Sequence, residues 1–137
     1  MNKDLTIAKK CIEVEIKALK KLSASFNRSS QFSKAVNLIS KMKGKCIVIG
    51  VGKSYLVGLK VSATLSSLGT PSVAFSANDL QHGGLGAIQK NHDVMLVFSV
   101  SGESSELNSI LSYANRHNIS VIGVSCKSLS MLLRYSK

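Results

Sequence analysis

Strand-like and helix-like patterns alternate along this chain from residue 45 onward, and this alternation constrains the fold more than any other feature. Four short, mainly apolar runs have the pattern of strands buried on both faces: 45–50, 72–75, 93–99 and 119–125. Helical spacing follows the runs, at intervals of about 25 residues, which suit a strand and a crossover helix. The pattern predicts an α/β fold, a three-layer α/β/α sandwich whose parallel strands are joined by right-handed helical crossovers.

The segments between the runs predict the helices of the outer layers. The longest of them covers 53–68, and we expect four of its apolar side chains to point inward: Leu56, Leu59, Val61 and Ala63. Asn78 and Asp79 are expected to cap a short helix. A further helix is expected around 107–114, and the last one begins at Ser128.

A helical pair is predicted ahead of the sheet, in residues 1–44. Apolar residues recur at spacings of three and four over 3–26, with lysines on the other face. The same period returns over 32–43, where Gly44 is placed to cap the helix end. Such apolar stripes have to be covered, either by the rest of the domain or by another subunit.

The net charge of +11 on 137 residues raises the question of a nucleic-acid partner. Residues 1–45 hold 11 basic and 3 acidic side chains, whereas 46–137 hold 7 and 4. The basic helices carry one aromatic residue each, Phe26 and Phe32, which is too few for platforms on which bases stack. We therefore interpret the excess as a solvated basic face and expect no nucleic-acid partner.

The three cysteines, Cys11, Cys46 and Cys126, are odd in number and widely spaced. They fit neither a disulfide framework nor a zinc site, so we expect small, buried thiols in a reduced, cytoplasmic protein without a bound metal. No apolar run approaches the roughly 18 residues that span a bilayer, and the N-terminus lacks the apolar stretch of a signal peptide. The sequence thus predicts no membrane partner.

A glycine-rich turn, Gly50-Val51-Gly52-Lys53-Ser54, follows the first run. A phosphate loop of the Walker type would need glycine at Ile47, and a dinucleotide fingerprint would need glycine at Tyr55, so both nucleotide motifs are excluded. The remaining chemistry is more general, because a helix N-terminus binds anions through its N–H groups. Ser54 adds a hydroxyl and Lys53 a positive charge, although such a turn can also be purely structural.

A serine-rich loop, residues 99–106, follows the third run and again opens a helix. The hydroxyls of Ser99, Ser101 and Ser104, together with free amides, form a neutral cradle of donors that suits a phosphate group. Capping of the helix is the alternative, but it requires only one of these serines. We therefore favour an anion site here.

One histidine, His82, stands in a glycine-rich turn after the second run, His82-Gly83-Gly84-Leu85-Gly86. It is either a structural hydrogen-bonding residue or a catalytic group, because residues that follow the strands of a parallel sheet border the ligand crevice. His92 and His117 receive no chemical role.

These motifs, with the stretch 65–71, resemble those of the sugar isomerase (SIS) domain, and more narrowly those of arabinose-5-phosphate isomerases of the KpsF/GutQ type. The resemblance covers about residues 10–137. It implies a single SIS domain over 1–137, with helices in 1–44 and a parallel core in 45–137. It also implies a homo-oligomer, tetramer or dimer, that converts D-ribulose 5-phosphate to D-arabinose 5-phosphate and back, without a cofactor, for the synthesis of Kdo in lipopolysaccharide or capsule.

The resemblance also implies roles for individual residues. The phosphate of the sugar would be held by five of them: Gly52, Ser54, Ser99, Ser101 and Ser104. Glu106 would be the acid and base that moves the proton of an enediol mechanism, and Lys53 would stabilise the developing negative oxygen. His82 would assist ring opening or proton transfer. For Glu103, the alternative is that it only holds the loop.

This chain departs from the family pattern in several places. The family has aspartate at Gly84, glycine at Tyr55 and threonine at Ser104, and it continues beyond Lys137 with a fifth strand, further helices and tandem CBS domains. The resemblance thus predicts a C-terminally shortened domain without CBS domains. Two functions follow: an isomerase, completed if necessary by neighbouring subunits, or a non-catalytic module that binds a phosphosugar, as in regulators that respond to sugars.

Overall fold

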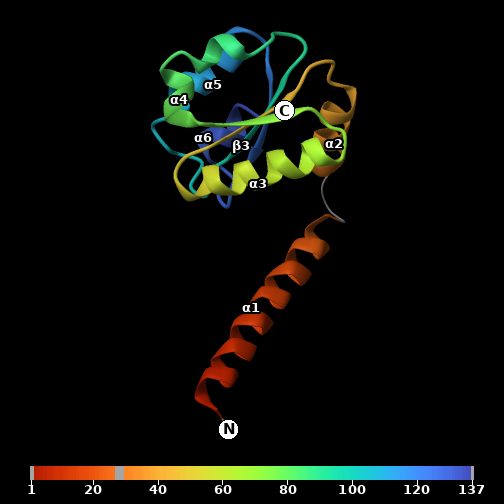
Figure 1. Cartoon of the computed structure of the whole chain (residues 1–137), viewed down its shortest axis with the longest axis vertical. Coiled ribbons are helices and arrows are strands. Elements are labelled where there is room, and N and C mark those ends of the chain that lie inside the picture. Colours follow the sequence, from red (N-terminus) through yellow and green to blue (C-terminus); the bar gives the residue numbers. More distant parts are fainter. Residues whose placement is uncertain (1, 27–29, 137) are drawn as a thin grey trace. The chain divides into compact units, whose positions relative to one another are not determined.

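The computed structural model describes residues 2–26 and 30–136 (Figure 1). The chain divides into two compact units, Met1–Lys34 and Ala35–Lys137, which are described separately. No helix in the described part of the chain is long and apolar enough to cross a membrane.

The first unit consists of helix α1 (Lys3–Phe26) and the first turn of helix α2 (Gln31–Lys41). The side chain of Asn2 accepts a hydrogen bond from the backbone N–H of Asp4 at 3.0 Å, which is the contact of a helix N-cap. No residue of α1 is buried, and the large apolar side chains of its stripe are about half exposed, from Ile16 at 46% to Leu19 at 64%. The helix is therefore confirmed, and its apolar stripe is exposed along its whole length.

The second unit is built on a four-stranded parallel sheet with the order β2-β1-β3-β4. Its strands are β1 (Cys46–Gly50), β2 (Ser72–Ser76), β3 (Val94–Phe98) and β4 (Ser120–Val124). The predicted parallel α/β fold is confirmed. Since the chain moves from β1 to β2 on one side and continues to β3 on the other, the order reverses between β1 and β3. Ligands of such sheets bind at this reversal, beyond the carboxyl ends of the strands.

Helices cover both faces of the sheet, and the alternation of side chains along β1 divides the core between these faces. Ile47 and Ile49 pack in one core with α4 (Ala77–Gln81), α5 (Leu107–Arg116) and α6 (Met131–Arg134). Cys46 and Val48 pack in the other core with the end of α2 and with α3 (Lys53–Ser67). Figure 1 shows α3 on one side of the sheet and α4 and α5 on the other, so the unit has the predicted three layers.

The inward face of α3 differs from the prediction. Leu56 and Leu59 are 63% and 41% exposed, and Ala63 is exposed as well. The face on the sheet is formed instead by a group that includes small residues: Gly58, Val61, Ser62 and Leu65. A Cβ atom on Gly58 would lie 3.1 Å from a Val48 methyl group, so the helix packs closely on β1 through small residues. Of the four side chains expected inward, the structure confirms Val61.

Two helix boundaries, the start of α4 and the end of α2, differ from the prediction. Helix α4 begins at Ala77 after Ser76, so Asn78 and Asp79 lie inside its first turn rather than at the cap. Helix α2 ends at Lys41, before Gly44. Gly44 instead donates its N–H to the carbonyl of His92 at 2.9 Å, at a point where a Cβ atom would collide with the Asp93 carboxylate. Glycine is needed at this position because the backbone lies so close to the turn before β3 that a side chain would not fit.

Asp93 holds this turn through a buried carboxylate. Its side chain is fully buried and accepts hydrogen bonds from the N–H groups of Lys45 and Gln89, both at 2.8 Å, and from Lys45 Nζ at 3.1 Å. Burial by itself raises the pKa of Asp93, but these hydrogen bonds and the charge of Lys45 outweigh it and hold the pKa below its usual 3.8.

Replacement of Asp93 by asparagine should lower the free energy of unfolding by about 2 kcal/mol at pH 7, because hydrogen bonds to a buried charge are lost. A folded pKa below the unfolded value means that the carboxylate stabilises the fold fully above pH 3.8 and loses this effect as the pH falls through the folded pKa. Urea unfolding of both proteins measures the difference, which should vanish at low pH. Asp79→Asn, at an exposed site, is the control and should change stability by less than about 0.5 kcal/mol. Equal effects of the two substitutions would contradict this role.

Candidate functional site

The turns after β1 and β3 start side by side at the carboxyl edge of the sheet, because Gly50 pairs with Phe98 in the parallel ladder. A pocket of about 220 Å³ lies at this edge. Its walls come from α3, from the end of β3 and from the end of β4: Ser54, Val57, Phe98, Ser99, Val100, Val124, Ser125 and Cys126. The structure thus brings Ser54 and Ser99, two residues predicted to hold phosphate, into one pocket.

The turn after β1 requires glycine at two positions for different reasons. A Cβ atom on Gly50 would lie 2.5 Å from backbone atoms of Ser54 and Tyr55, so only glycine lets the helix start this close to the strand. Gly52 has φ of 53°, which favours glycine. The carbonyl of Gly52 then accepts the N–H of Tyr55 at 3.0 Å, and Lys53 begins α3 with an exposed side chain. The predicted anion-binding turn thus has the compact geometry of a strand that leads directly into a helix N-terminus.

The loop after β3 is held by its own serines. Ser99 Oγ accepts the N–H of Gly102 at 3.0 Å and lies 3.3 Å from Ser104 Oγ, while Ser101 Oγ accepts the N–H of Glu103 at 3.2 Å. Because a hydroxyl that accepts a hydrogen bond can still donate its own hydrogen, Ser101 and one member of the Ser99–Ser104 pair can each donate to an anion. The residue before α5 is Glu106, which makes no side-chain capping bond, so none of the three serines is the N-cap of α5.

The serine loop is also fixed to the start of α6. The carboxylate of Glu103 accepts the N–H of Met131 at 2.9 Å, and the carbonyl of Gly102 accepts the N–H of Leu132 at 3.0 Å. Gly102 has φ of 66° and packs directly against Ser130, whose buried Oγ has no hydrogen-bond partner among the described residues. Glu103 therefore fixes the serine loop to the start of α6.

His82 and Glu106 lie on neighbouring segments. His82 is the C-cap residue directly after α4 and is exposed, and the side-chain amide of the preceding Gln81 donates to the carbonyl of Glu106 at 2.6 Å. The carboxylate of Glu106 is half-buried and accepts the hydroxyl of Ser105 at 3.2 Å. Within residues 2–26 and 30–136, no hydrogen bond or ion pair joins Lys53, His82 and Glu106 to one another, and no three His, Cys, Asp or Glu side chains gather as metal ligands.

The sequence interpretation missed three residues of this edge: Ser125, Cys126 and Ser130. Ser125 and Cys126 follow β4 and line the pocket, so the rule that ligands meet the carboxyl ends of parallel strands would have identified them. Ser130 carried no such signal, because only the folded loop places it against Gly102.

The comparison of the sequence with known protein families decides the family. The model of the SIS domain matches residues 38–137, which is most of the chain. The chain belongs to the SIS domain family.

Relatives of this SIS domain carry names of sugar-phosphate isomerases. It is 33% identical over 132 residues to a probable arabinose 5-phosphate isomerase of Haemophilus influenzae, covering 96% of this chain and 38% of the relative. It is 34% identical over 139 residues to the arabinose 5-phosphate isomerase KdsD of Francisella tularensis, covering 99% and 42%. The SIS domain thus spans about two fifths of the length of these curated relatives.

Solved structures share the fold of this SIS domain. A protein of Escherichia coli CFT073, solved in complex with arabinose 5-phosphate, superposes with a TM-score of 0.90 at 29% identity, covering 100% of this chain and 72% of that chain. The sugar isomerase domain of an RpiR transcription factor from Sphaerobacter thermophilus superposes with a TM-score of 0.74 at 21% identity, covering 92% and 71%. The second likeness concerns the fold alone.

The three cysteines differ in accessibility, which corrects the expectation that all of them are buried. Cys46 is buried in the sheet, whereas Cys11 and Cys126 are exposed, because one lies on the uncovered helix α1 and the other lines the pocket. Burial raises the pKa of the Cys46 thiol to about 11.

We expect iodoacetamide to alkylate Cys126 and Cys11 in the native protein and to spare Cys46, since only about one in a thousand thiols with a pKa of 11 is ionised at pH 8. Mass spectrometry of tryptic peptides measures the extent at each site. In a Cys11→Ser variant, only Cys126 should react, and the added group should fill the pocket. Alkylation of Cys46 as fast as of Cys126 would contradict the packing of β1.

Proposed function

We propose that this SIS domain binds a pentose 5-phosphate at the carboxyl edge of its sheet and interconverts D-ribulose 5-phosphate and D-arabinose 5-phosphate. The observation that carries the proposal is the pocket beside the start of α3 at the carboxyl ends of β3 and β4, whose lining includes both Ser54 and Ser99. The names of the relatives and the likeness to a structure solved with arabinose 5-phosphate support the substrate class.

In the proposed complex, the phosphate lies at the serine-rich edge. Hydroxyls of Ser54 and Ser99, with those of Ser101 and Ser104 in the same loop, donate to its oxygens, and the N–H of Gly52 at the start of α3 points to the same anion. Since the phosphate brings its own charge, neutral donors are sufficient, and the Lys53 ammonium is left for the reacting end of the sugar.

The reaction is proposed to proceed through an enediol. In the direction from aldose to ketose, the Glu106 carboxylate takes the proton from C2, and the electron pair of the C–H bond forms the C1–C2 double bond while the carbonyl π electrons move to O1. The Lys53 ammonium stabilises the negative oxygen. The proton then returns from Glu106 to C1, O1 takes up a proton while the O2 hydroxyl gives one up, and the ketone forms at C2. His82 assists ring opening or the transfer of the hydroxyl protons, and no redox cofactor or metal takes part.

The proposed pathway, cellular location and oligomeric state are based on the same substrate. The product would feed the synthesis of Kdo for lipopolysaccharide or capsule, in the cytoplasm, and the protein would act as a homodimer or homotetramer. The names of the relatives support the reaction class. The exposed apolar stripe of α1 supports an assembly in which another subunit covers this stripe.

A non-catalytic module that binds a phosphosugar is the second candidate. It is favoured by Gly84 in the turn after His82, a position where the resemblance to the isomerases implies an aspartate.

Incubation of the purified protein with D-ribulose 5-phosphate, followed by measurement of D-arabinose 5-phosphate, separates the two candidates. Turnover supports the isomerase. Thermal stabilisation by the phosphosugar without turnover would contradict the isomerase and leave the binding module. In either case, the double variant Ser99→Ala/Ser101→Ala should lose the stabilisation, and normal binding by this variant would show that the phosphate lies elsewhere.

A further inference from the structure

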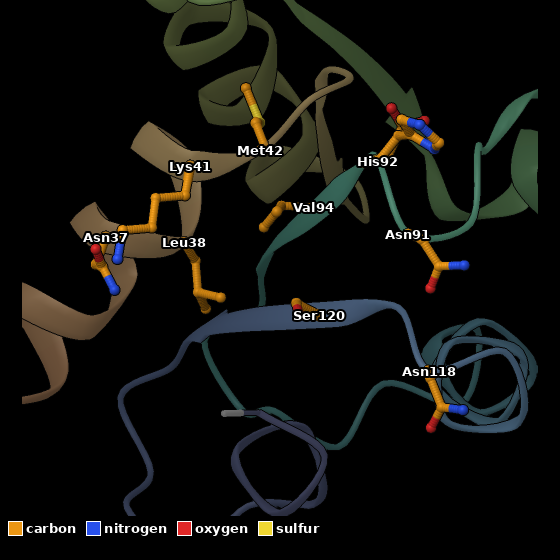
Figure 2. Close-up of a pocket in the computed structure, with 10 residues that line it drawn as sticks. Asn37, Leu38, Lys41, Met42, Asn91, His92, Val94, Asn118 and Ser120 are labelled. Atoms are coloured by element: carbon orange, nitrogen blue, oxygen red, sulfur yellow. The ribbon is translucent and has the colours of Figure 1, made fainter.

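A second pocket lies at the opposite edge of the sheet, where β3 and β4 begin. Its volume is about 300 Å³, at the lower end of the range for small-molecule sites, so it has room for one small molecule. Helix α2 contributes Asn37 and Lys41, the turn before β3 contributes Asn91 and His92, and Asn118 precedes β4. Figure 2 shows the two α2 residues on one side of the pocket and the other three on the opposite side.

The floor of this amino-edge pocket is formed by packed elements. Leu38 on α2 and Met42, the residue after the helix ends, are half-buried and pack in the same core as Val94, the first residue of β3. Ser120, the first residue of β4, lies beside them and adds a half-buried hydroxyl (Figure 2). The polar groups are therefore carried by α2, by the first residue of β4 and by the turns that lead directly into β3 and β4, next to elements that pack in the core.

The charge around the amino-edge pocket is positive. Its carboxylate, Asp93, is buried and already neutralised by Lys45, which leaves the ammonium of Lys41 without an acidic partner in the pocket lining. Partial burial and the charges of Lys90 and Arg116 lower the pKa of His117, the neighbour of Asn118, so two further cations lie close to this edge. Such a field attracts anions.

We propose that the amino-edge pocket binds a small hydroxylated anion, a molecule with one carboxylate or phosphate group and several hydroxyls. The ammonium of Lys41 offers three donors to the anionic group. The amides of Asn37, Asn91 and Asn118 each donate and accept, which is the pairing that hydroxyl groups require. Because this pocket borders the starts of β3 and β4, it is separate from the phosphosugar site, which borders their carboxyl ends.

Nuclear magnetic resonance of the full ¹⁵N-labelled chain tests this site directly, because asparagine side-chain amides give their own signals. The probes are D-gluconate, glycerol 1-phosphate and the neutral polyol sorbitol. We expect saturable shifts of the Asn91 and Asn118 amide signals with gluconate or with the phosphate, and none with sorbitol. The probe that acts identifies the anionic group, and the readout does not depend on turnover at the other edge.

Two lysine variants make the test specific. Lys41→Ala should weaken binding of the active probe about tenfold, since a charged hydrogen bond is lost. Lys43→Ala removes the same charge from an exposed position outside the pocket lining and should leave binding unchanged. The proposal is overturned if neither anion shifts these amides saturably, or if both variants weaken binding equally, which would indicate attraction to net charge alone.

Discussion

Replacement of Gly102 by alanine is expected to lower the free energy of unfolding by about 2–4 kcal/mol and to abolish binding of phosphosugar. An alanine with φ of 66° is strained by about 1–2 kcal/mol, and its Cβ would collide with Ser130 and lie 2.9 Å from Ser125 Oγ. The loop would have to move, and it carries Ser99, Ser101 and Ser104. Urea unfolding measures the stability, and thermal shift with D-arabinose 5-phosphate measures the binding.

Two comparisons separate the collision from the backbone strain. Gly69 also has positive φ, 86°, but a Cβ there would meet no atom within 4 Å, so Gly69→Ala should cost only the strain and leave binding intact. In Gly102→Ala/Ser130→Gly, the main colliding side chain is removed, and part of the stability and binding should return. If Gly69→Ala is as harmful as Gly102→Ala, the contact with Ser130 is not what fixes the loop.

Much of the fold could be predicted because its strands are buried on both faces. The run at 93–99 has the pattern of a buried strand, and the structure has β3 at Val94–Phe98, with Met95 and Val97 fully buried. In contrast, the face of α3 was predicted wrongly for a physical reason. Periodicity identifies large apolar residues, but this helix packs through Gly58 against β1 and through Ser62 against β2, where closeness to the sheet rather than side-chain volume decides the contact.

The candidate site also has residues that could be predicted from the sequence and residues that could not. Residues that directly follow β1 and β3 could be predicted, because parallel strands end at one edge, and Ser54 and Ser99 do line one pocket. Ser130 could not be predicted, because it is distant from the serine loop in sequence. It lies against Gly102 because the start of α6 is hydrogen-bonded to the loop. The amino-edge pocket likewise depends on α2 and two turns that no motif connects.

In the proposed isomerase reaction, replacement of Glu106 by glutamine is expected to lower the turnover of D-ribulose 5-phosphate about 1,000-fold while binding changes little. Glutamine keeps the size of the side chain and an acceptor for Ser105, but it cannot take the proton from carbon, and general acid–base catalysis contributes about 10²–10⁴-fold. Steady-state kinetics gives the loss in kcat, and thermal shift with the phosphosugar gives the binding. The separation of the two effects is what distinguishes a proton-transfer group from a residue that only shapes the pocket.

Glu103→Gln provides the matched control, because it makes the same chemical change three positions earlier in the same loop. The Glu103 carboxylate accepts the N–H of Met131 at 2.9 Å, and a glutamine oxygen can accept the same bond, so we expect turnover within about threefold of the original. Equal losses for both variants would mean that negative charge in the loop, rather than a proton acceptor at residue 106, supports the reaction. Full activity of Glu106→Gln would move the acid–base role to another group, and His82 is the next candidate, since Gln81 ties its segment to the carbonyl of Glu106.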